Sequence, residues 1–475
     1  MDIHPVRING QAVTTDRSVQ IRAPFDGRLV GAVPVCSAEH TDRGVIAARR
    51  VMSEEPLPTW RRAEVLDRAA ELLAEVTVAE DLAQTIALEA AKPISAARTE
   101  VSRCVSTFRF ASAVCRQLSG EVLPLDAAEA GEGRLGLTLR VPVGVVGAIT
   151  PFNFPLNLVA HKVAPAIAAG CAVVLKPAHQ TPITGLKLAE LLLDRCGLPD
   201  GWLHTVTGEG REVGAALVAH NEVAMITFTG SPEVGWSIRE AAPRKKVSLE
   251  LGNNAPVIVA ADGDVETAAT RIAAGGNSHA GQSCISVQRV LVAQSVAERF
   301  TAALVEAVAA LEVGDPLDEA TQVSKLITEQ DTQRVGDWIA EAVTAGARIV
   351  YGGQVDDAGV LVPAVLTDAP ADARVWRDEI FGPVVVVNRY EDIEEAFSAA
   401  NDTRYGLQAG IFTADLATAR RAIEALDFGG IVINDVPTWR ADQMPYGGLR
   451  DSGNTREGPA YAAREMTEIR TAVFS

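Results

Sequence analysis

The chain has 475 residues, which at a typical domain size of roughly 150 residues predicts about three structural units. Its formal charge is −18, from 43 Lys and Arg against 61 Asp and Glu, so nucleic acid and anionic membranes are not expected partners. The six cysteines and seven histidines show no spacing typical of a metal site. No secretory signal or membrane-spanning run is recognisable, and we expect a cytoplasmic protein without a metal.

Residues 60–118 have apolar positions three and four apart, which predicts amphipathic helices, with a break at Pro93. Strands are expected at 135–150 and 172–178, with a helix at 155–170 between them. The alternation then continues with helices at 181–197, 211–220 and 231–242, and strands at 202–208 and 225–230.

A second alternating series begins near residue 255. Strands are expected at 257–260, 288–294, 384–390 and 430–434, and helices at 266–274 and up to 311. Alternating strands and helices favour parallel sheets covered on both faces. The sequence therefore predicts an α/β fold with two doubly wound domains that meet near residue 252.

Three polar residues stand at positions suited to chemistry. Cys284 follows a small, glycine-bearing turn that leaves room for a substrate and for backbone N–H donors, although a buried packing cysteine is the alternative. Glu250 ends an apolar strand, where partial burial suits a general base and a solvent-facing charge is the alternative. Asn153 lies in PFNFP and either donates to an oxyanion or caps the helix starting near Pro155.

Two glycine turns come close to a dinucleotide-binding motif. GEGREVG at 208–214 and FTGSPEVG at 228–235 each miss the spacing of GxGxxG. Both still place a turn at a helix N-terminus, where phosphate binds well.

Seven motifs occur in order along nearly the whole chain: PFNFP, LKPA, FTGS, LELGNNAP, GQSCISVQRV, EIFGPV and PYGGLRDSGNTREG. Together they closely resemble the aldehyde dehydrogenase superfamily, in particular its non-acylating lactaldehyde and phosphonoaldehyde dehydrogenase group. The resemblance implies that Cys284 attacks the aldehyde, that Asn153 and the Cys284 N–H hold the oxyanion, and that hydride passes to a nicotinamide. Glu250 would then activate the water that hydrolyses the thioester, with Lys162 and Glu457 as proton relays or a plain salt bridge.

The resemblance also implies a cofactor, NAD or NADP. Lys176 would bind the adenosine ribose, Ser231 the pyrophosphate, Gly208 the adenine side, and Glu379 with Phe381 the nicotinamide riboside. The complete implied set is Ile149, Thr150, Pro151, Lys176, Ala178, His179, Gly208, Gly230, Ser231, Leu251, Gly252, Glu379 and Phe381. His179 stands where many NAD-preferring relatives carry Glu, so the choice between NAD and NADP stays open.

Four residues are expected at the substrate by the same resemblance: Arg103, His161, Ser283 and Arg440. Two guanidinium groups that converge on a pocket would select a small anionic tail, with ordinary surface arginines as the alternative. Ser283 stands where phosphate-binding relatives often carry Arg, which weakens the case for a phosphate-specific pocket. The expected substrate is therefore a small polar or anionic aldehyde.

The predicted units are an NAD(P)-binding domain (1–118 and 139–252), a catalytic domain (253–450) and an oligomerisation flap (119–138 and 462–475). The flap implies a homodimer or homotetramer, because its strands would otherwise leave an open edge. Two other functions stay open from the residues alone, a cysteine-dependent esterase without redox chemistry and a catalytically silent nucleotide-binding homologue.

Overall fold

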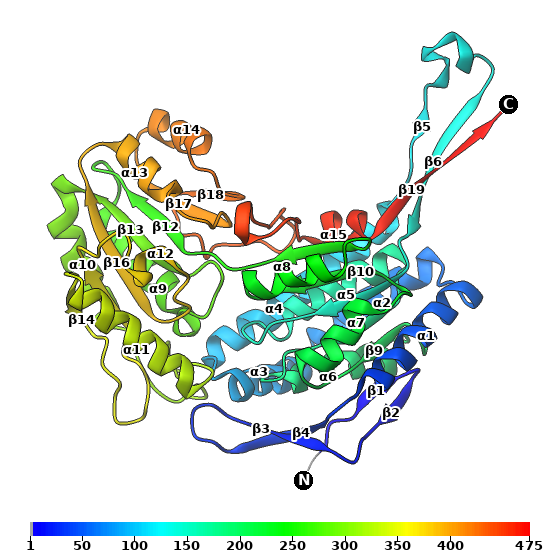
Figure 1. The fold of residues 1–475 in the computed structure, drawn as a ribbon, viewed down its shortest axis with the longest axis horizontal. Coiled ribbons are helices and arrows are strands. Elements are labelled where there is room, and N and C mark those ends of the chain that lie inside the picture. Colours follow the sequence, from blue (N-terminus) through cyan, green and yellow to red (C-terminus); the bar gives the residue numbers. More distant parts are fainter. Residues whose placement is uncertain (1–2) are drawn as a thin grey trace.

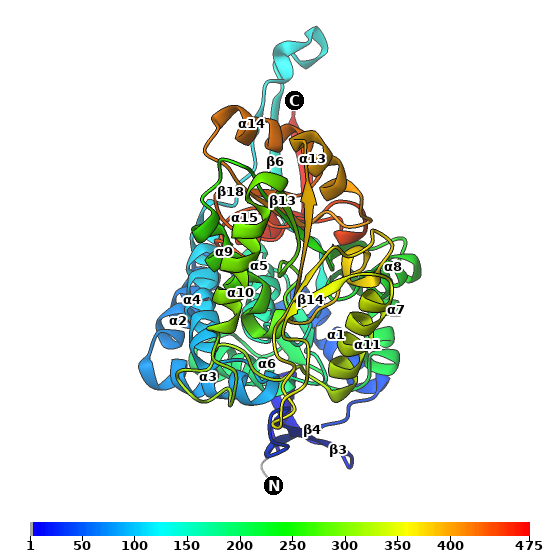
Figure 2. The ribbon, with the colours of Figure 1, turned by 90° about the vertical axis from the view of Figure 1, so that its left-hand side faces the viewer.

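The computed structural model describes residues 3–475, so the first two residues of the predicted unit 1–118 lie outside it (Figure 1). Two α/β lobes lie side by side, and a narrow β arm projects from one of them (Figures 1 and 2). In this range no helix has the length and apolar character needed to cross a bilayer.

The N-terminal segment forms two antiparallel strand pairs that the sequence analysis did not predict, β1 with β2 and β3 with β4. Their bounds are Val6–Ile8, Gln11–Val13, Ser18–Arg22 and Leu29–Pro34. Four helices follow, α1 (Ala38–Glu54), α2 (Thr59–Leu73), α3 (Val76–Ala90) and α4 (Ile94–Gln117). The predicted break at Pro93 is confirmed, because α3 ends before it and α4 begins directly after it.

The sheet of the first lobe has five parallel strands in the order β11-β10-β7-β8-β9. Its strands are β7 (Val145–Ile149), β8 (Val173–Lys176), β9 (Leu203–Thr205), β10 (Val223–Thr229) and β11 (Lys246–Glu250). From β7 the chain first extends the sheet on one side and then returns to extend it on the other. Such a reversal leaves a crevice at the carboxyl ends of the strands, between β7 and β10, where ligands bind in open α/β sheets.

Helices cover this sheet. They are α5 (Asn157–Ala169), α6 (Pro182–Glu190), α7 (Ala215–Ala219) and α8 (Pro232–Ala241), with single π-helical turns at Leu191–Arg195 and Gly210–Gly214. α1 and α7 contact each other and the sheet, while α5 packs on the sheet together with α2 and α4. All five residues of β7 are buried, as expected for a strand covered on both sides.

The second lobe has a seven-stranded sheet in the order β14-β15-β16-β13-β12-β17-β18. The predicted strands correspond to β12 (Ala255–Val259), β13 (Val287–Ala293), β16 (Val384–Tyr390) and β18 (Gly430–Ile433). Three strands were not predicted: β14 (Arg348–Tyr351), β15 (Ala364–Thr367) and β17 (Gln408–Phe412). Only β14 runs antiparallel to its neighbour in the described sheet, and it forms one edge.

Helices also enclose the second sheet: α9 (Val265–Asn277), α10 (Ala297–Ala309), α11 (Glu329–Thr344), α12 (Arg374–Arg377), α13 (Ile393–Asn401) and α14 (Leu416–Ala425). Successive residues of β12 belong to different cores, since Ile258 packs in one cluster while Val257 and Val259 pack in another. Both faces of the strand are therefore buried. The predicted fold class is confirmed in both lobes.

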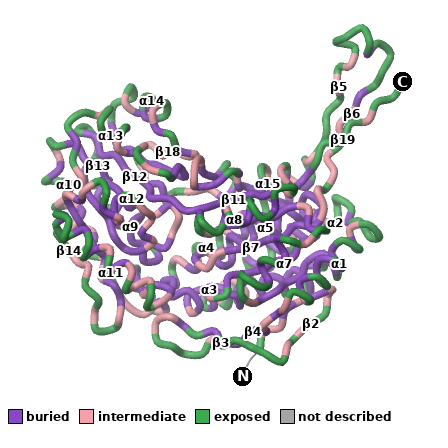
Figure 3. The backbone as a smooth tube through the Cα atoms, in the orientation of Figure 1, coloured by how far each residue is buried: buried purple, intermediate pink, exposed green. Residues whose placement is uncertain are grey.

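The projecting arm is a three-stranded antiparallel sheet in the order β19-β6-β5. Its strands are β5 (Val122–Leu123), β6 (Leu135–Pro142) and β19 (Thr467–Phe474), and α15 (Pro459–Glu465) leads into β19. β6 therefore continues past the predicted flap boundary at 138. Most of the arm is exposed (Figure 3), including the apolar side chains of Leu135, Leu139, Ile469, Val473 and Phe474.

Candidate active site

A cavity of about 560 Å³ lies where the first sheet, the loops of the second lobe and the C-terminal segment meet. Its wall combines residues of all three kinds that the sequence analysis singled out. These are Asn153, Glu250 and Cys284 for catalysis; Pro151, Gly230, Ser231, Leu251, Gly252, Glu379 and Phe381 for the cofactor; and Arg103, Ser283 and Arg440 for the substrate. Lys92, Tyr446 and Glu457 also line it.

Cys284 lies in the loop between α9 and β13, after a tight turn in which His279 and Ala280 have positive φ. A side chain at Gly281 would lie 2.0 Å from the Gly382 carbonyl oxygen, so this turn requires glycine. The other five cysteines are buried, whereas Cys284 is partly exposed and lines the cavity. Burial in its pocket raises the pKa of the thiol to about 12.

Glu250 is the last residue of β11, and its side chain is buried rather than facing solvent. The solvent-facing alternative is therefore wrong. Neither carboxylate oxygen has a hydrogen-bond partner within residues 3–475. Burial, reinforced by the nearby Glu457 carboxylate, holds the pKa of Glu250 well above its usual range. A carboxyl group in this state is suited to accept a proton from a water molecule in the cavity.

Asn153 lies in the loop between β7 and α5. The helix-cap alternative is wrong, because the N-cap position of α5 is Leu156 and the N-terminal N–H groups of this helix donate to Glu100 rather than to Asn153. Instead Asn153 Nδ2 donates to the Gln282 carbonyl at 2.9 Å, which brings it next to the segment that carries Cys284. An amide nitrogen has two N–H groups, so one remains for a ligand in the cavity.

A buried ion pair that the sequence analysis missed holds the Asn153 loop. Lys92 Nζ donates to Glu100 at 2.6 Å and to the Asn153 carbonyl at 2.8 Å, and it lies over the Phe154 ring. Glu100 in turn accepts from the backbone N–H groups of Leu156 and Asn157. The AKP sequence at 91–93 gave no sign of this, because the pairing depends on a loop that lies far along the chain.

Most of the implied cofactor residues lie at the carboxyl edge of the first sheet, whereas Glu379 and Phe381 come from the second lobe, between α12 and β16. Strand register places Ile149 beside Lys176 and Phe228, and Thr229 beside Glu250. Thr150 and Leu251 directly follow β7 and β11, and Ala178 follows β8 after one intervening residue. The edge coincides with the switch point between β7 and β10, where dinucleotides bind in this class of sheet.

Local geometry fits a phosphate and a ribose at this edge. Ser231 caps α8 by accepting from Val234 N–H, and Gly208 adopts a φ of 144° in its turn. A Cβ at Gly252 would lie 2.1 Å from a Glu379 carboxylate oxygen, so only glycine permits this approach. Phe381 meets Phe152 edge to face across the cavity wall, at 5.9 Å between ring centroids. His179 is exposed just after Lys176 and Ala178.

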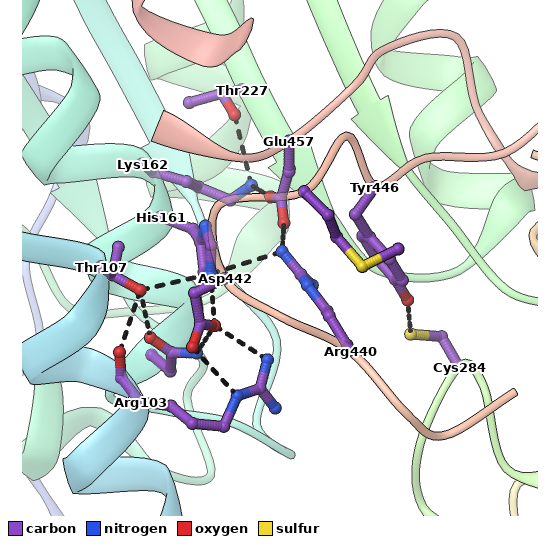
Figure 4. Close-up of polar contacts among 12 residues, drawn as sticks. Arg103, Thr107, His161, Lys162, Thr227, Cys284, Arg440, Asp442, Tyr446 and Glu457 are labelled. Atoms are coloured by element: carbon purple, nitrogen blue, oxygen red, sulfur yellow. Dashed lines mark hydrogen bonds and ion pairs between the residues drawn. The ribbon is translucent and has the colours of Figure 1, made fainter. Parts of the chain in front are cut away.

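Behind the cavity wall one carboxylate, Asp442, binds two of the four predicted substrate residues, Arg103 and His161 (Figure 4). Asp442 accepts from Arg103 Nη2 at 2.9 Å, from Asn157 Nδ2 at 3.0 Å and contacts His161 Nε2 at 3.1 Å. These partners come from α4 and α5, so the carboxylate ties both helices to the C-terminal loop. The sequence analysis placed Arg440 at the substrate but did not single out this nearby acid.

Arg440 is held in a second cluster of charges. Its Nη2 lies 3.3 Å from Glu457 and 3.3 Å from His161, and its guanidinium stacks 3.7 Å from the centroid of the Tyr446 ring. Lys162 donates to Glu457 at 3.1 Å and to Thr227 at 3.2 Å. Although burial acts in the opposite direction, Lys162, His161 and Arg440 hold the pKa of Glu457 down to about 2.

Three of the four predicted substrate residues therefore line the cavity. His161 does not, and is fully buried behind Asp442 and Arg440. The surface-arginine alternative does not fit either arginine, since Arg103 is 25 % exposed and Arg440 only 5 %.

The family model described as "Aldehyde dehydrogenase family" matches residues 12–472. The chain is 43% identical to a 3-sulfolactaldehyde dehydrogenase of Priestia aryabhattai over 98% of this chain and 97% of the relative. It is 38% identical to a lactaldehyde dehydrogenase of Methanococcus aeolicus over 98% and 99% of the two chains.

Among solved structures, a glyceraldehyde-3-phosphate dehydrogenase of Methanocaldococcus jannaschii complexed with NADP superposes with a TM-score of 0.92. It is 38% identical to this chain and covers 97% of it, and 100% of that structure is matched. With the match of nearly the entire chain to the family model, this chain belongs to the aldehyde dehydrogenase family, whose hydride acceptor is NAD or NADP.

Proposed function

We propose that the chain oxidises a small aldehyde with an anionic tail, of the sulfo- or phosphonoaldehyde type, to the carboxylate with NAD(P). The observation that carries this proposal is that Arg103 and Arg440 line the same cavity as Cys284. A tail bound between the arginines would place the aldehyde carbon of a small substrate towards the sulfur.

The charge balance at this end of the cavity supports an anion. Three basic side chains, Arg103, Arg440 and Lys162, face two carboxylates, Asp442 and Glu457. Burial first and Arg440 second lower the pKa of His161, so it is left out of this count. The three basic side chains and two carboxylates therefore leave one positive charge unmatched. Arg103 also has unused donors, because two of its five N–H groups suffice to bind Asp442. Free donors on a planar guanidinium match the oxygens of a sulfonate, phosphonate or carboxylate.

The described residues support a two-stage reaction. The Cys284 thiolate forms a bond to the aldehyde carbon, while Asn153 Nδ2 and the Cys284 N–H stabilise the oxyanion. Ser231, Glu379 and Phe381 would hold a bound NAD(P), which would supply the acceptor for the hydride of this carbon. Glu250 then takes a proton from water, which attacks the thioester and releases the carboxylate and the thiol. A Lys162–Glu457 pair close to Glu250 would pass that proton onward.

A second candidate substrate is a neutral hydroxyaldehyde of the lactaldehyde type. Asp442 favours it, because this carboxylate already neutralises Arg103 and could accept a hydrogen bond from a substrate hydroxyl. The relatives named above act, by their names, on one substrate of each kind.

We further propose a homo-oligomer, either a dimer or a tetramer, in the cytoplasm. The outer edge of β19 and the apolar side chains of the arm are exposed in one chain, which supports burial against a second copy. Division into a cofactor domain, a catalytic domain and this flap remains our proposal for the domains. Dual use of NAD and NADP is proposed from His179, which offers no carboxylate against a 2′-phosphate.

Reduction of NAD and NADP should be followed by absorbance with 3-sulfolactaldehyde, phosphonoacetaldehyde, phosphonoformaldehyde, glyceraldehyde 3-phosphate, succinic semialdehyde, lactaldehyde and propanal. We expect the highest kcat/KM with a tailed anion. Preference for lactaldehyde would favour the second candidate. Hydrolysis of an ester without any cofactor reduction would indicate an esterase, and cofactor binding without either reaction a silent homologue.

The matched control is Cys284→Ala. This variant should lose dehydrogenase and esterase activity but still bind NAD(P), because the phosphate turns are untouched. If it kept more than a small fraction of wild-type turnover, Cys284 would not be the nucleophile.

A further inference from the structure

The nucleophile has a hydroxyl neighbour. Tyr446 Oη lies 2.9 Å from Cys284 Sγ (Figure 4), which is a short contact for a bond that involves sulfur. Within residues 3–475 this hydroxyl is the only side-chain hydrogen-bond partner of the sulfur. The ring is 3 % exposed and lines the cavity.

The backbone fixes this contact. Tyr446 and Glu457 form an antiparallel bridge, in which each N–H donates to the carbonyl of the other, at 3.1 and 2.6 Å. The Arg440 guanidinium lies 3.7 Å from the ring centroid on one face. A cation over a phenol ring draws electron density from the hydroxyl, so it strengthens the O–H as a donor.

The charges around the sulfur make such a donor useful. When ionised, Glu250 and Glu379 disfavour a negative charge on the sulfur, whereas Arg440 favours one. Burial also disfavours the thiolate. The phenol itself keeps its proton, since burial and the neighbouring sulfur hold the pKa of Tyr446 far above its usual range.

We propose that Tyr446 is a catalytic residue whose hydroxyl donates a hydrogen bond to the Cys284 thiolate that attacks the aldehyde. This inference rests on the proposed role of Cys284. In the attack, the thiol proton has already passed to a solvent base, and a sulfur lone pair forms the C–S bond. The π pair of the carbonyl moves to oxygen, and Tyr446 retains its own proton throughout.

A donor of this kind has two opposing effects. It raises the fraction of thiolate at neutral pH, but it also makes each thiolate a weaker nucleophile, because nucleophilicity falls with basicity with a Brønsted coefficient of about 0.4–0.5. A hydrogen bond to a charged group contributes about 1.5–3 kcal/mol, or roughly ten- to hundredfold in the thiolate equilibrium. The net gain in rate at neutral pH is then about three- to tenfold.

Alkylation of Cys284 by iodoacetamide isolates this effect, because it needs neither aldehyde nor cofactor. In that step the thiolate displaces iodide and forms one S–C bond. The full-length Tyr446→Phe enzyme keeps the ring under Arg440. Its rate of alkylation and that of wild type should be compared after brief pH jumps, with final pH values from mildly acidic to strongly alkaline. Mass spectrometry of the Cys284 peptide gives the rate at this cysteine alone.

Tyr390→Phe is the matched control, since Tyr390 is also buried and donates to a carbonyl, that of Val259, outside the cavity. We expect Tyr446→Phe to react about three- to tenfold more slowly at neutral pH, with the gap closing as the pH rises, and Tyr390→Phe to behave as wild type. An unchanged neutral rate, or one reduced by the same factor at every pH, would overturn the proposal. Failure of every aldehyde in the panel with this profile intact would instead count against the proposed function alone.

Discussion

Arg103 and Asp442 form an ion pair at 2.9 Å although 339 positions separate them in the chain. The carboxylate matches the arginine charge before any substrate binds, and it keeps the guanidinium at the cavity wall. Arg103 is therefore oriented in advance, which reduces the entropy that a bound tail must overcome. The two arginines expected at the substrate are held by different partners, because Arg440 is engaged by Glu457 and Tyr446.

Replacement of Arg103 should separate substrates by charge. Arg103→Ala removes donors to an anionic tail and leaves Asp442 to repel it, and we expect kcat/KM for a sulfo- or phosphonoaldehyde to fall about ten- to hundredfold. Propanal should be nearly unaffected. Arg103→Lys should restore only part of the loss, because a point charge cannot reproduce the two-pronged geometry.

Arg440→Ala is the comparison that checks this assignment. It should reduce activity on neutral aldehydes as well as charged ones, and more on the charged ones, since it removes a contact to the tail and also releases Glu457 and the Tyr446 ring. Equal losses on both substrate types for Arg103→Ala would show that Arg103 supports the loop through Asp442, and the lactaldehyde-type candidate would then be preferred.

Glu250→Gln should slow hydrolysis of the thioester more than its formation. A burst of reduced cofactor should persist in rapid-mixing experiments while steady turnover collapses. Loss of the burst together with turnover would indicate a different role for Glu250.

The pH dependence of thioester hydrolysis follows from the raised pKa of Glu250. As the pH falls through that value the carboxylate becomes protonated and can no longer accept a proton, so the rate should fall on the acid side. This fall in rate should begin at a pH above the ordinary pKa range of a glutamate, and it should be absent in Glu250→Gln. An acid limb at an ordinary glutamate pKa would mean that Glu250 is not buried during this step.

His179→Glu should shift preference towards NAD. A carboxylate beside the adenosine ribose would repel a 2′-phosphate, at a cost to NADP on the order of 1–3 kcal/mol. The ratio of kcat/KM values for NADP and NAD measures this directly. If the ratio did not change, the ribose would not lie at this position.

The Lys92–Glu100 pair should contribute strongly to stability and to the oxyanion site. Lys92→Met leaves a carboxylate unpaired in a site where both side chains are at most 2 % exposed, and we expect a loss of about 3–5 kcal/mol in the free energy of unfolding. Urea denaturation checks this. Lys187→Met, which breaks an exposed pair with Asp81, should cost about 0–1 kcal/mol, and a similar loss in both variants would contradict the prediction.

Much of the fold could be predicted because its signals are local. The break at Pro93 and the buried strands β7, β8, β12, β13 and β16 follow from short windows of sequence, whereas the buried strands β15 and β17 were missed. The edge strand β14 was missed because it has only four residues, and its short apolar run is mostly exposed rather than part of a buried pattern. The N-terminal strands were missed because each is too short to show a clear hydrophobic pattern.

The site was predictable only where motifs carried it. Cys284, Glu250 and Asn153 could be named from motifs, and the structure places them around one cavity. Asp442, Lys92 and Tyr446 could not, because each acts through a partner from a distant segment. A sequence window around Arg440 contains Asp442, but nothing in it shows that this acid binds α4 rather than solvent.

The last segment of the chain completes the site, since Arg440, Asp442, Tyr446 and Glu457 all follow β18 and pack against α4, α5 and the Cys284 loop. Closing loops of several hundred residues is entropically costly and occurs late when a chain folds. During refolding, helical circular dichroism should therefore recover before dehydrogenase activity. A nascent chain would acquire catalytic competence only after residues 440–457 have left the ribosome.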